Sequence, residues 1–192
     1  IVETEDLHGG VISQTRRLTT DRQHQLVLKQ SVQAPADLYA CEAEGLRALR
    51  AAGLPTPEVL AESSDFLLLE AIDNTTAAEP NWEQAGQAVA HLHLHTNDRF
   101  GFSHNNYLGM MPQINTWMDD GHQFFGQHRL LRYVYEPLSL ETLTADDTRA
   151  IERLVERLPQ LIPVQPASLL HGDLWHANLL FAASGAPVFI DP

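Results

Sequence analysis

The C-terminal segment HGDLWHANLLFAASGAPVFIDP contains two short apolar runs, at residues 179–181 and 188–190. Asn178 directly precedes the first run and Asp191 directly follows the second. With a tight turn at Ser184-Gly185, residues 179–181 and 188–190 are expected to pair as an antiparallel hairpin, which brings Asn178 opposite Asp191 at its open end. An amide oxygen and a carboxylate are hard oxygen donors, and Mg²⁺ binds such donors together with water and phosphate. The pattern therefore predicts a magnesium site at the open end of the hairpin.

A second acid, Asp173, lies five residues before Asn178 in the segment that enters the hairpin. This is the spacing of H-R-D-x-x-x-x-N in the protein-kinase catalytic loop, and His171 matches its leading histidine. The alternative is that these residues only cap turns and that Asp191 only ends a strand. The favoured interpretation is phosphoryl transfer, with Asp173 as the catalytic base and with Asn178 and Asp191 as the metal ligands.

Phosphoryl transfer also needs a cation on the nucleotide phosphates, and Lys29 is the only lysine in the chain. It lies in LVLKQ, where strand alternation puts Leu26 and Leu28 on one face and Val27 and Lys29 on the other. A compact ammonium on a flexible stem suits a point contact with phosphate. The alternative is a surface lysine on an edge strand, in a sequence that otherwise uses arginine.

Such a lysine usually pairs with a carboxylate from the following helix, and Glu42 and Glu44 compete for this role. Glu42 lies on the same helical stripe as Leu46 and Leu49, whereas Glu44 is turned away from it. We favour Glu42 as the partner. The alternatives are pairing with Glu44 or two carboxylates that are merely solvated.

The elements expected around these residues fall into two groups. Residues 9–18 and 26–32 predict a hairpin, residues 37–52 a helix that ends at Gly53, and EVLAES and FLLLEAI two further strands, the second buried on both faces. We expect residues 1–72 to form a small β-rich, nucleotide-binding N-terminal lobe with one helix.

After Asp73 the pattern becomes mainly helical. A helix is expected to begin near Pro80, an aromatic segment over residues 114–135 is interrupted by Gly121 and Gly126, and a third helix covers residues 145–158, with Thr144 and Asp147 as a capping pair. Residues 73–192 are therefore expected to form a C-terminal lobe that carries the catalytic loop and the metal-binding hairpin. The predicted fold class is α+β, with two lobes.

The composition limits the partners. With 25 acidic and 12 basic residues the net charge is −13, which argues against nucleic acid and anionic membrane surfaces as partners. Cys41 is the only cysteine, so the chain can form no internal disulfide. No apolar run reaches the length of a membrane span and the first residues do not resemble a signal peptide, so we expect a cytoplasmic monomer.

With these residues placed, the sequence resembles the fructosamine kinase (ketosamine-3-kinase) family, within the wider aminoglycoside phosphotransferase and choline kinase group of protein-kinase-like folds. The resemblance covers nearly the whole chain. It is carried by HGDLWHAN, similar to the family's HGDLWSGN, by the terminal PVFIDP, and by GGVIS, FGFSHNNYLG and QINTWMDDGHQFFGQHRL. Trp175 and the segment from Gln113 to Trp117 favour fructosamine kinases over the wider group.

The resemblance implies ATP-dependent phosphorylation of the sugar 3-hydroxyl of ketoamines, such as fructosamine or ribulosamine adducts, with Mg²⁺ as the cofactor. The phosphorylated product decomposes and frees the amine, which is a deglycation reaction. The resemblance also implies that the loop after Gly9-Gly10 covers the phosphates. The remaining implied site residues are Glu70, Ala71 and Ile72, a backbone segment that meets adenine. We also expect Trp175 and His176 to contact the substrate.

Two departures from the family pattern leave alternatives open. His176-Ala177 replaces the family's Ser-Gly, and the imidazole either narrows the acceptor site or adds a contact. The family continues past Asp-Pro into further helices, so we expect a C-terminal lobe that is truncated after the hairpin: either this chain is a piece of a longer polypeptide, or the product itself is a truncated chain. A related phosphotransferase of the aminoglycoside- or choline-kinase type, or a noncatalytic nucleotide-binding module, is the alternative function. In AVAHLHLHT, which contains His91, His93 and His95, a zinc site that uses His91 and His95 on one helix face is a weaker alternative.

Overall fold

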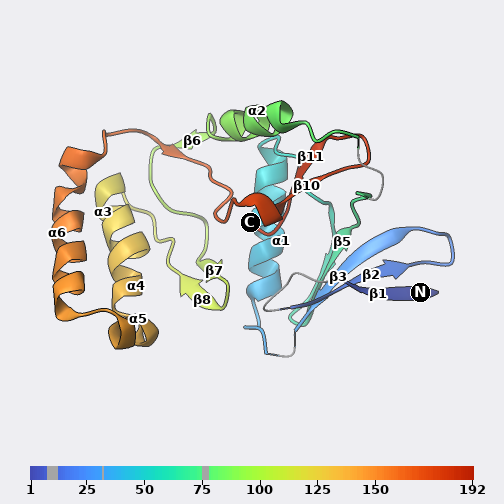
Figure 1. The fold of residues 1–192 in the computed structure, drawn as a ribbon, viewed down its shortest axis with the longest axis horizontal. Helices are drawn as coiled ribbons and strands as arrows, with labels where there is room; N and C mark the ends of the chain where they lie inside the picture. Colours follow the sequence, from blue (N-terminus) through green and yellow to red (C-terminus); the bar gives the residue numbers. More distant parts are fainter. Residues whose placement is uncertain (8–12, 32, 75–77) are drawn as a thin grey trace. The chain divides into compact units, whose positions relative to one another are not determined.

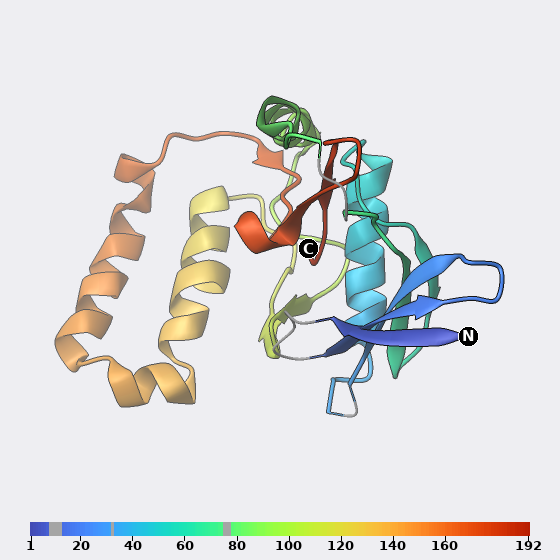
Figure 2. The same ribbon diagram turned by 45° about the vertical axis from the view of Figure 1, so that its right-hand side comes forward.

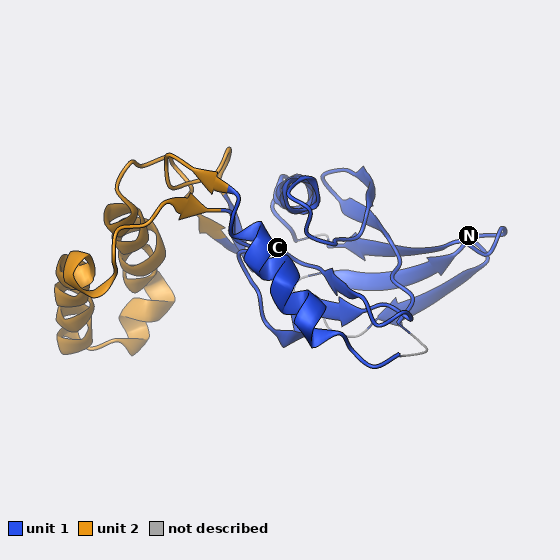
Figure 3. Ribbon diagram, turned by 90° about the horizontal axis from the view of Figure 1, so that it is seen from above, with its two compact units in different colours: residues 1–95, 106–111, 169–192 blue, residues 96–105, 112–168 orange. Residues whose placement is uncertain are grey.

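The computed structural model describes residues 1–7, 13–31, 33–74 and 78–192 (Figure 1). The predicted phosphate loop after Gly9-Gly10 lies outside these residues. The contacts divide the chain into two compact units, which Figure 3 colours separately. Unit 1 comprises residues 1–95, 106–111 and 169–192, and unit 2 comprises residues 96–105 and 112–168. These units are not the expected lobes 1–72 and 73–192, and the lobe boundary stays a prediction.

Unit 1 contains an antiparallel sheet of five strands in the order β1-β2-β3-β5-β4. The strands are β1 (Glu3–Leu7), β2 (Gln14–Thr19), β3 (Gln25–Gln30), β4 (Val59–Glu62) and β5 (Phe66–Glu70). The predicted hairpin is the β2–β3 pair, and Lys29 in it lies opposite Thr15 on one side and Leu67 on the other. Strand β1 was not predicted.

The burial of β5 differs from the prediction. Leu67 and Leu69 are buried, whereas Leu68 on the opposite face is only half-buried. The apolar run suggested a strand covered on both faces, but a helix packs on one face only. The prediction of two covered faces was therefore wrong.

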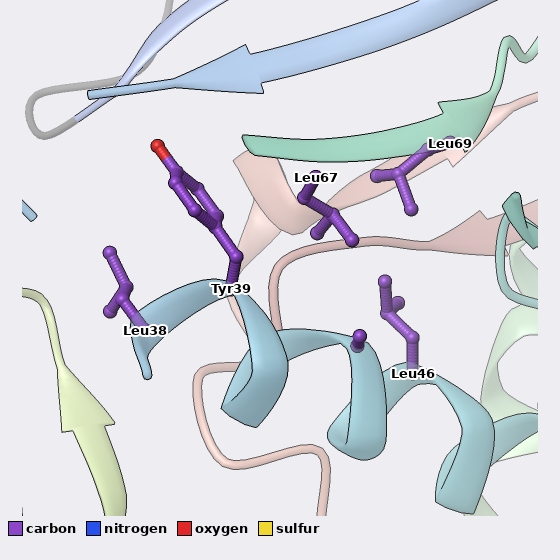
Figure 4. Packing of buried hydrophobic residues seen from close by; sticks show 6 residues of the cluster. Leu38, Tyr39, Leu46, Leu67 and Leu69 are labelled. Atoms are coloured by element: carbon purple, nitrogen blue, oxygen red, sulfur yellow. The ribbon is translucent and has the colours of Figure 1, made fainter. Parts of the chain in front are cut away.

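Helix α1 (Leu38–Ala51) covers that face of the sheet, close to the predicted range of 37–52. Its buried side chains recur at helical spacing and pack on Leu67 and Leu69 of β5, as Figure 4 shows; they are Leu38, Tyr39, Ala43 and Leu46. Each large side chain buried in this way contributes about 1.5–3 kcal/mol relative to an exposed one. This cluster fixes the helix against the strands that carry Lys29.

The last turn of α1 belongs to a second cluster. Leu49 packs with Leu92 of α2 (Trp82–Leu92) and with Phe189 of strand β11 (Pro187–Phe189). Strand β10 (Leu179–Phe181) pairs with β11 antiparallel, so the C-terminal hairpin is present, one residue earlier on its second strand than predicted. Figure 2 shows this hairpin beside α1. One helix therefore packs against both the sheet and the hairpin.

Unit 2 is mainly helical. Its helical elements are α3 (Gly121–Phe125), the π-helical segment η1 (Gly126–Leu131), α4 (Arg132–Val134), α5 (Pro137–Thr142) and α6 (Ala145–Leu161). The predicted capping pair is confirmed, because the Thr144 hydroxyl accepts the Asp147 N–H and the Asp147 carboxylate accepts the Thr144 N–H. The short strands of unit 2 are β6 (Thr96–Asn97) and β9 (Ala167–Ser168), while β7 (Asn106–Leu108) and the 3₁₀ turn η2 (His176–Asn178) belong to unit 1 and β8 (Met111–Gln113) begins at the last residue of its middle segment.

Gly126 does not interrupt the helical run of unit 2. Helix α3 passes directly into η1 at this residue. A Cβ atom at Gly126 would lie 2.7 Å from Cγ1 of Val155 on α6, so the glycine permits close packing of η1 on α6. Among the described residues, no helix is both long enough and apolar enough to cross a bilayer.

Two helical glycines give a matched test of this packing. Gly126→Ala is expected to lower the free energy of unfolding by about 1–3 kcal/mol, since the added methyl group overpacks against Val155. Gly86→Ala on α2, where the added methyl carbon would meet no tertiary neighbour within 4 Å, is expected to raise it by about 0.5–1 kcal/mol. Urea denaturation followed by circular dichroism measures both changes. Equal effects of the two substitutions would contradict the packing argument.

Candidate functional site

The ammonium group of Lys29 is held between two carboxylates within unit 1. Its Nζ lies 2.6 Å from Oε1 of Glu42 on α1 and 3.0 Å from Oδ1 of Asp191 after β11. The side chains of Lys29 and Glu42 are only 12% and 14% exposed. The ion pair predicted from the helical stripe is therefore present, and it is made by Glu42, whereas Glu44 is exposed.

The electrostatics keep this lysine charged. Burial disfavours the ammonium, but the carboxylates of Glu42 and Asp191 outweigh it and raise the pKa of Lys29 above its ordinary value. Burial raises the pKa of Glu42, and the neighbouring ammonium limits that rise. A fixed positive charge on strand β3 is suited to an anionic ligand such as a phosphate.

Asn178 links the two aspartates around the hairpin. It is 6% exposed, and its amide Nδ2 donates to the Asp173 carbonyl at 2.8 Å, to Oδ2 of Asp173 at 3.2 Å and to the Asp191 carbonyl at 3.3 Å. Its own backbone carbonyl accepts the Ile190 N–H at 3.0 Å, as expected for residues at the open end of the hairpin. With the amide nitrogen engaged, the amide oxygen is the atom suited to a cation.

Asp191 has an unusual backbone conformation. Its φ is +57°, in the left-handed region that aspartate and asparagine adopt more readily than other non-glycine residues. This turn ends the hairpin and lets the side chain reach Lys29 on the sheet. Sequence patterns gave no signal for it, because the alternation of strand residues does not report the dihedral angle of the residue that follows.

Gly45 is a further residue that the sequence interpretation missed. A Cβ atom there would lie 3.2 Å from Cγ of Pro192, so the glycine lets the Asp191-Pro192 segment approach α1 closely. It stands one turn after Glu42 on the same helix. The available signal was a glycine in the middle of a strong helical pattern, which often marks close packing.

His171 is buried beside the two aspartates. It is 5% exposed, and neither ring nitrogen has a hydrogen-bond partner in the part of the chain that the structure describes. Burial lowers its pKa, although the charges of Asp173 and Asp191 oppose the effect. The ring lies 6.2 Å from that of Phe189, so His171 packs beside the hairpin.

The other predicted site residues also belong to unit 1. Trp175 is 53% exposed and His176 is exposed, with ring centroids 4.9 Å apart, two and three positions after Asp173 in the chain. Glu70 ends β5, and Ala71 and Ile72 follow it. The next residue in that segment, Asp73, accepts the Ala183 N–H of the hairpin turn at 2.7 Å, so the segment runs beside the hairpin. The roles of these residues stay predictions.

The hairpin donors fit magnesium better than the histidines fit zinc. Among the described residues, no group of three or more His, Cys, Asp or Glu side chains could hold a metal ion, and His95 instead makes a 3.3 Å contact with the His91 carbonyl. Asn178 and Asp191 provide one amide oxygen and one carboxylate. Two protein oxygens are few for zinc but are typical of Mg²⁺ that shares its coordination with phosphate and water.

The chain resembles one family of known proteins over its whole length. A family model described as fructosamine kinase matches residues 1–192. A "Probable ketoamine kinase" of Lactiplantibacillus plantarum is 35% identical, over the whole of this chain and 69% of that protein. The "Protein-ribulosamine 3-kinase, chloroplastic" of Arabidopsis thaliana is 28% identical, over the whole chain and 61% of that protein.

The fold of this chain also matches solved structures. The crystal structure of a "putative fructosamine-3-kinase" from Thermobifida fusca matches with a TM-score of 0.89 at 28% identity, over the whole of this chain and 68% of that one. Phosphotransferase structures below 25% identity share the fold as well. The predicted α+β, protein-kinase-like fold is therefore confirmed. The chain spans about two thirds of the length of these proteins.

Removing one carboxylate tests the ion pair. Glu42→Ala leaves the buried ammonium with Asp191 alone, and we expect the free energy of unfolding to fall by up to about 3 kcal/mol. The control Glu44→Ala, on the exposed side of α1, is expected to change it by less than about 0.5 kcal/mol. Urea denaturation measures the free energy of unfolding of both variants. Similar losses in the two would show that the Lys29–Glu42 ion pair contributes little to stability.

The buried His171 predicts a pH dependence of stability. Its pKa in the folded protein lies below the ordinary value of 6.5, so the unfolded chain binds the proton first and stability falls as the pH drops below about 6.5. His171→Phe removes this proton uptake. The difference in free energy of unfolding between pH 8 and pH 5 is expected to be smaller in the variant than in the wild type, whereas an unchanged difference would contradict a lowered pKa of His171.

Proposed function

This chain belongs to the fructosamine kinase family, and we propose that it transfers the γ-phosphoryl group of ATP to the sugar 3-hydroxyl of ketoamines such as fructosamine or ribulosamine adducts. The observation that supports the residue assignments is the contact between Lys29 and Asp191, 3.0 Å apart although 162 positions separate them in the sequence. It brings the lysine of the sheet to the hairpin that follows the catalytic loop. The 3-phosphate product decomposes and frees the amine, which is deglycation.

Asp173 is proposed as the base. Its carboxylate is exposed, and Oδ2 accepts a hydrogen bond from Nδ2 of Asn178, which restrains the side chain beside the hairpin. A carboxylate held in this way accepts the proton of the sugar hydroxyl as its oxygen attacks phosphorus. The exposed rings of Trp175 and His176 follow it in the chain and are proposed to contact the ketoamine.

The nucleotide is proposed to bind between the sheet and the hairpin of unit 1. Lys29 contacts the phosphates and Glu42 orients its ammonium, while the backbone of Glu70, Ala71 and Ile72 meets adenine. Asn178 and Asp191 would hold Mg²⁺, which supplies positive charge to the phosphate oxygens when bound. A cytoplasmic location and a monomeric state stay predictions.

Substituting the base tests the proposal. Asp173→Asn keeps the shape of the side chain but cannot accept the hydroxyl proton, so kcat for phosphorylation of fructosyl-lysine is expected to fall by about 10²–10⁴-fold. Nucleotide affinity is expected to stay within about twofold of the wild type, because the base acts on the acceptor and not on ATP. A coupled assay of ADP release measures the rate, and calorimetry with AMP-PNP measures the affinity.

Asp65→Asn, in the exposed turn between β4 and β5, is the control and is expected to leave both quantities unchanged. Equal loss of rate and of nucleotide affinity in Asp173→Asn would contradict the role as base. A panel of acceptors that includes choline and an aminoglycoside tests the related phosphotransferases. In the natural protein, nucleotide binding without turnover of any acceptor would instead support a noncatalytic module.

A further inference from the structure

Tyr39 has a hydroxyl group at the edge of an otherwise apolar cluster. The residue is 0% exposed and packs with Leu67 and Leu69 of β5. Figure 4 shows its ring beside these leucines, with the oxygen pointing away from them. The hydroxyl lies 2.9 Å from Oγ of Ser13, within hydrogen-bond distance. A phenylalanine would fill the same space without the cost of burying a hydroxyl, so the oxygen needs a separate explanation.

The contact joins the start of β2, which pairs with the strand of Lys29, to the helix that carries Glu42. Ser13 directly precedes β2, in which Thr15 lies opposite Lys29. Tyr39 lies one turn before Glu42 on α1. The Tyr39–Ser13 hydrogen bond therefore ties the start of β2 to the helix at the level of the Lys29–Glu42 ion pair.

The charges of that ion pair act on the phenol. Burial is the main cause of a raised pKa at Tyr39, the Ser13 bond and the Lys29 ammonium lower it, and the Glu42 carboxylate raises it further. The phenol therefore lies within the electrostatic influence of both Lys29 and Glu42. In the sequence, Ser13 also comes three residues after Gly10, at the end of the segment expected to cover the phosphates.

We propose that Tyr39 is a positioning residue for the nucleotide: through Ser13 it fixes the start of β2 relative to Glu42 and Lys29. This inference rests on the proposed function, in which Lys29 contacts the phosphates. It assigns a role in ATP affinity to a hydroxyl that does not touch the acceptor. The pair therefore affects nucleotide binding and leaves ketoamine binding unchanged.

A double-mutant cycle tests the inference. Tyr39→Phe and Ser13→Ala each remove one hydroxyl and keep the remaining packing. Each is expected to raise the Kd of AMP-PNP, measured by calorimetry, and the KM for ATP by about three- to tenfold, the range for one lost hydrogen bond. The double variant is expected to match either single variant, because the second change removes nothing further. KM for the ketoamine is expected to stay constant.

Val59→Ala is the matched control, since Val59 packs on the same cluster but carries no hydroxyl. It is expected to lower the melting temperature without changing the Kd of AMP-PNP. Additive effects of the two hydroxyl deletions, unchanged Kd values in both, or the same rise in Kd in Val59→Ala would overturn the inference.

The nucleotide measurement separates this inference from the proposed function. AMP-PNP binding needs no acceptor, so an altered Kd with a coupled cycle supports the role of Tyr39 even where no ketoamine is phosphorylated. A wild-type protein that binds AMP-PNP, with variants that bind it equally well, overturns the role of Tyr39 alone. A wild-type protein that does not bind AMP-PNP overturns both.

Discussion

The buried ammonium of Lys29 is the constraint on which the rest of the site depends. A charge removed from water is costly unless it is paired, and here the sheet supplies the cation while the helix and the segment after the hairpin each supply a carboxylate. Such a cluster is a poor source of stability, since apolar residues of the same volume often serve as well. The cluster matters for the site because it brings residues 29, 42 and 191 together at one point. Proteins keep an arrangement of this kind where the charge itself is used.

Helix α1 makes that convergence possible because its apolar stripe is divided between two neighbours. Leu46 and the residues before it pack on the sheet, and Leu49 packs with α2 and the hairpin strand of Phe189. Glu42 stands on the sheet-facing part of this stripe, and Gly45, one turn later, makes room for Pro192. The helix thus sets the distance between the strand of Lys29 and the hairpin. At this distance Lys29 can form ion pairs with both Glu42 and Asp191.

The sequence predicts those parts of the site that follow from local periodicity. Glu42 could be chosen over Glu44 because the 3.6-residue stripe separates them, and Asn178 could be placed near Asp191 because a hairpin pairs its ends. Contacts that join distant elements by shape could not be predicted: the fit of Pro192 on Gly45 and the left-handed turn at Asp191 leave no periodic trace. The burial of β5 was predicted wrongly for a related reason, because an apolar run does not reveal how many layers cover a strand.

The chemistry of Asn178 explains how two acids with different tasks can stand side by side. Its amide nitrogen donates both to the Asp173 carboxylate and to the Asp191 carbonyl, contacts that a third aspartate at this position could not make. A neutral side chain also avoids adding a further negative charge. In the proposed function, Asn178 would orient the base with its amide nitrogen and offer its amide oxygen to the metal, so the two neighbouring acids would have different tasks.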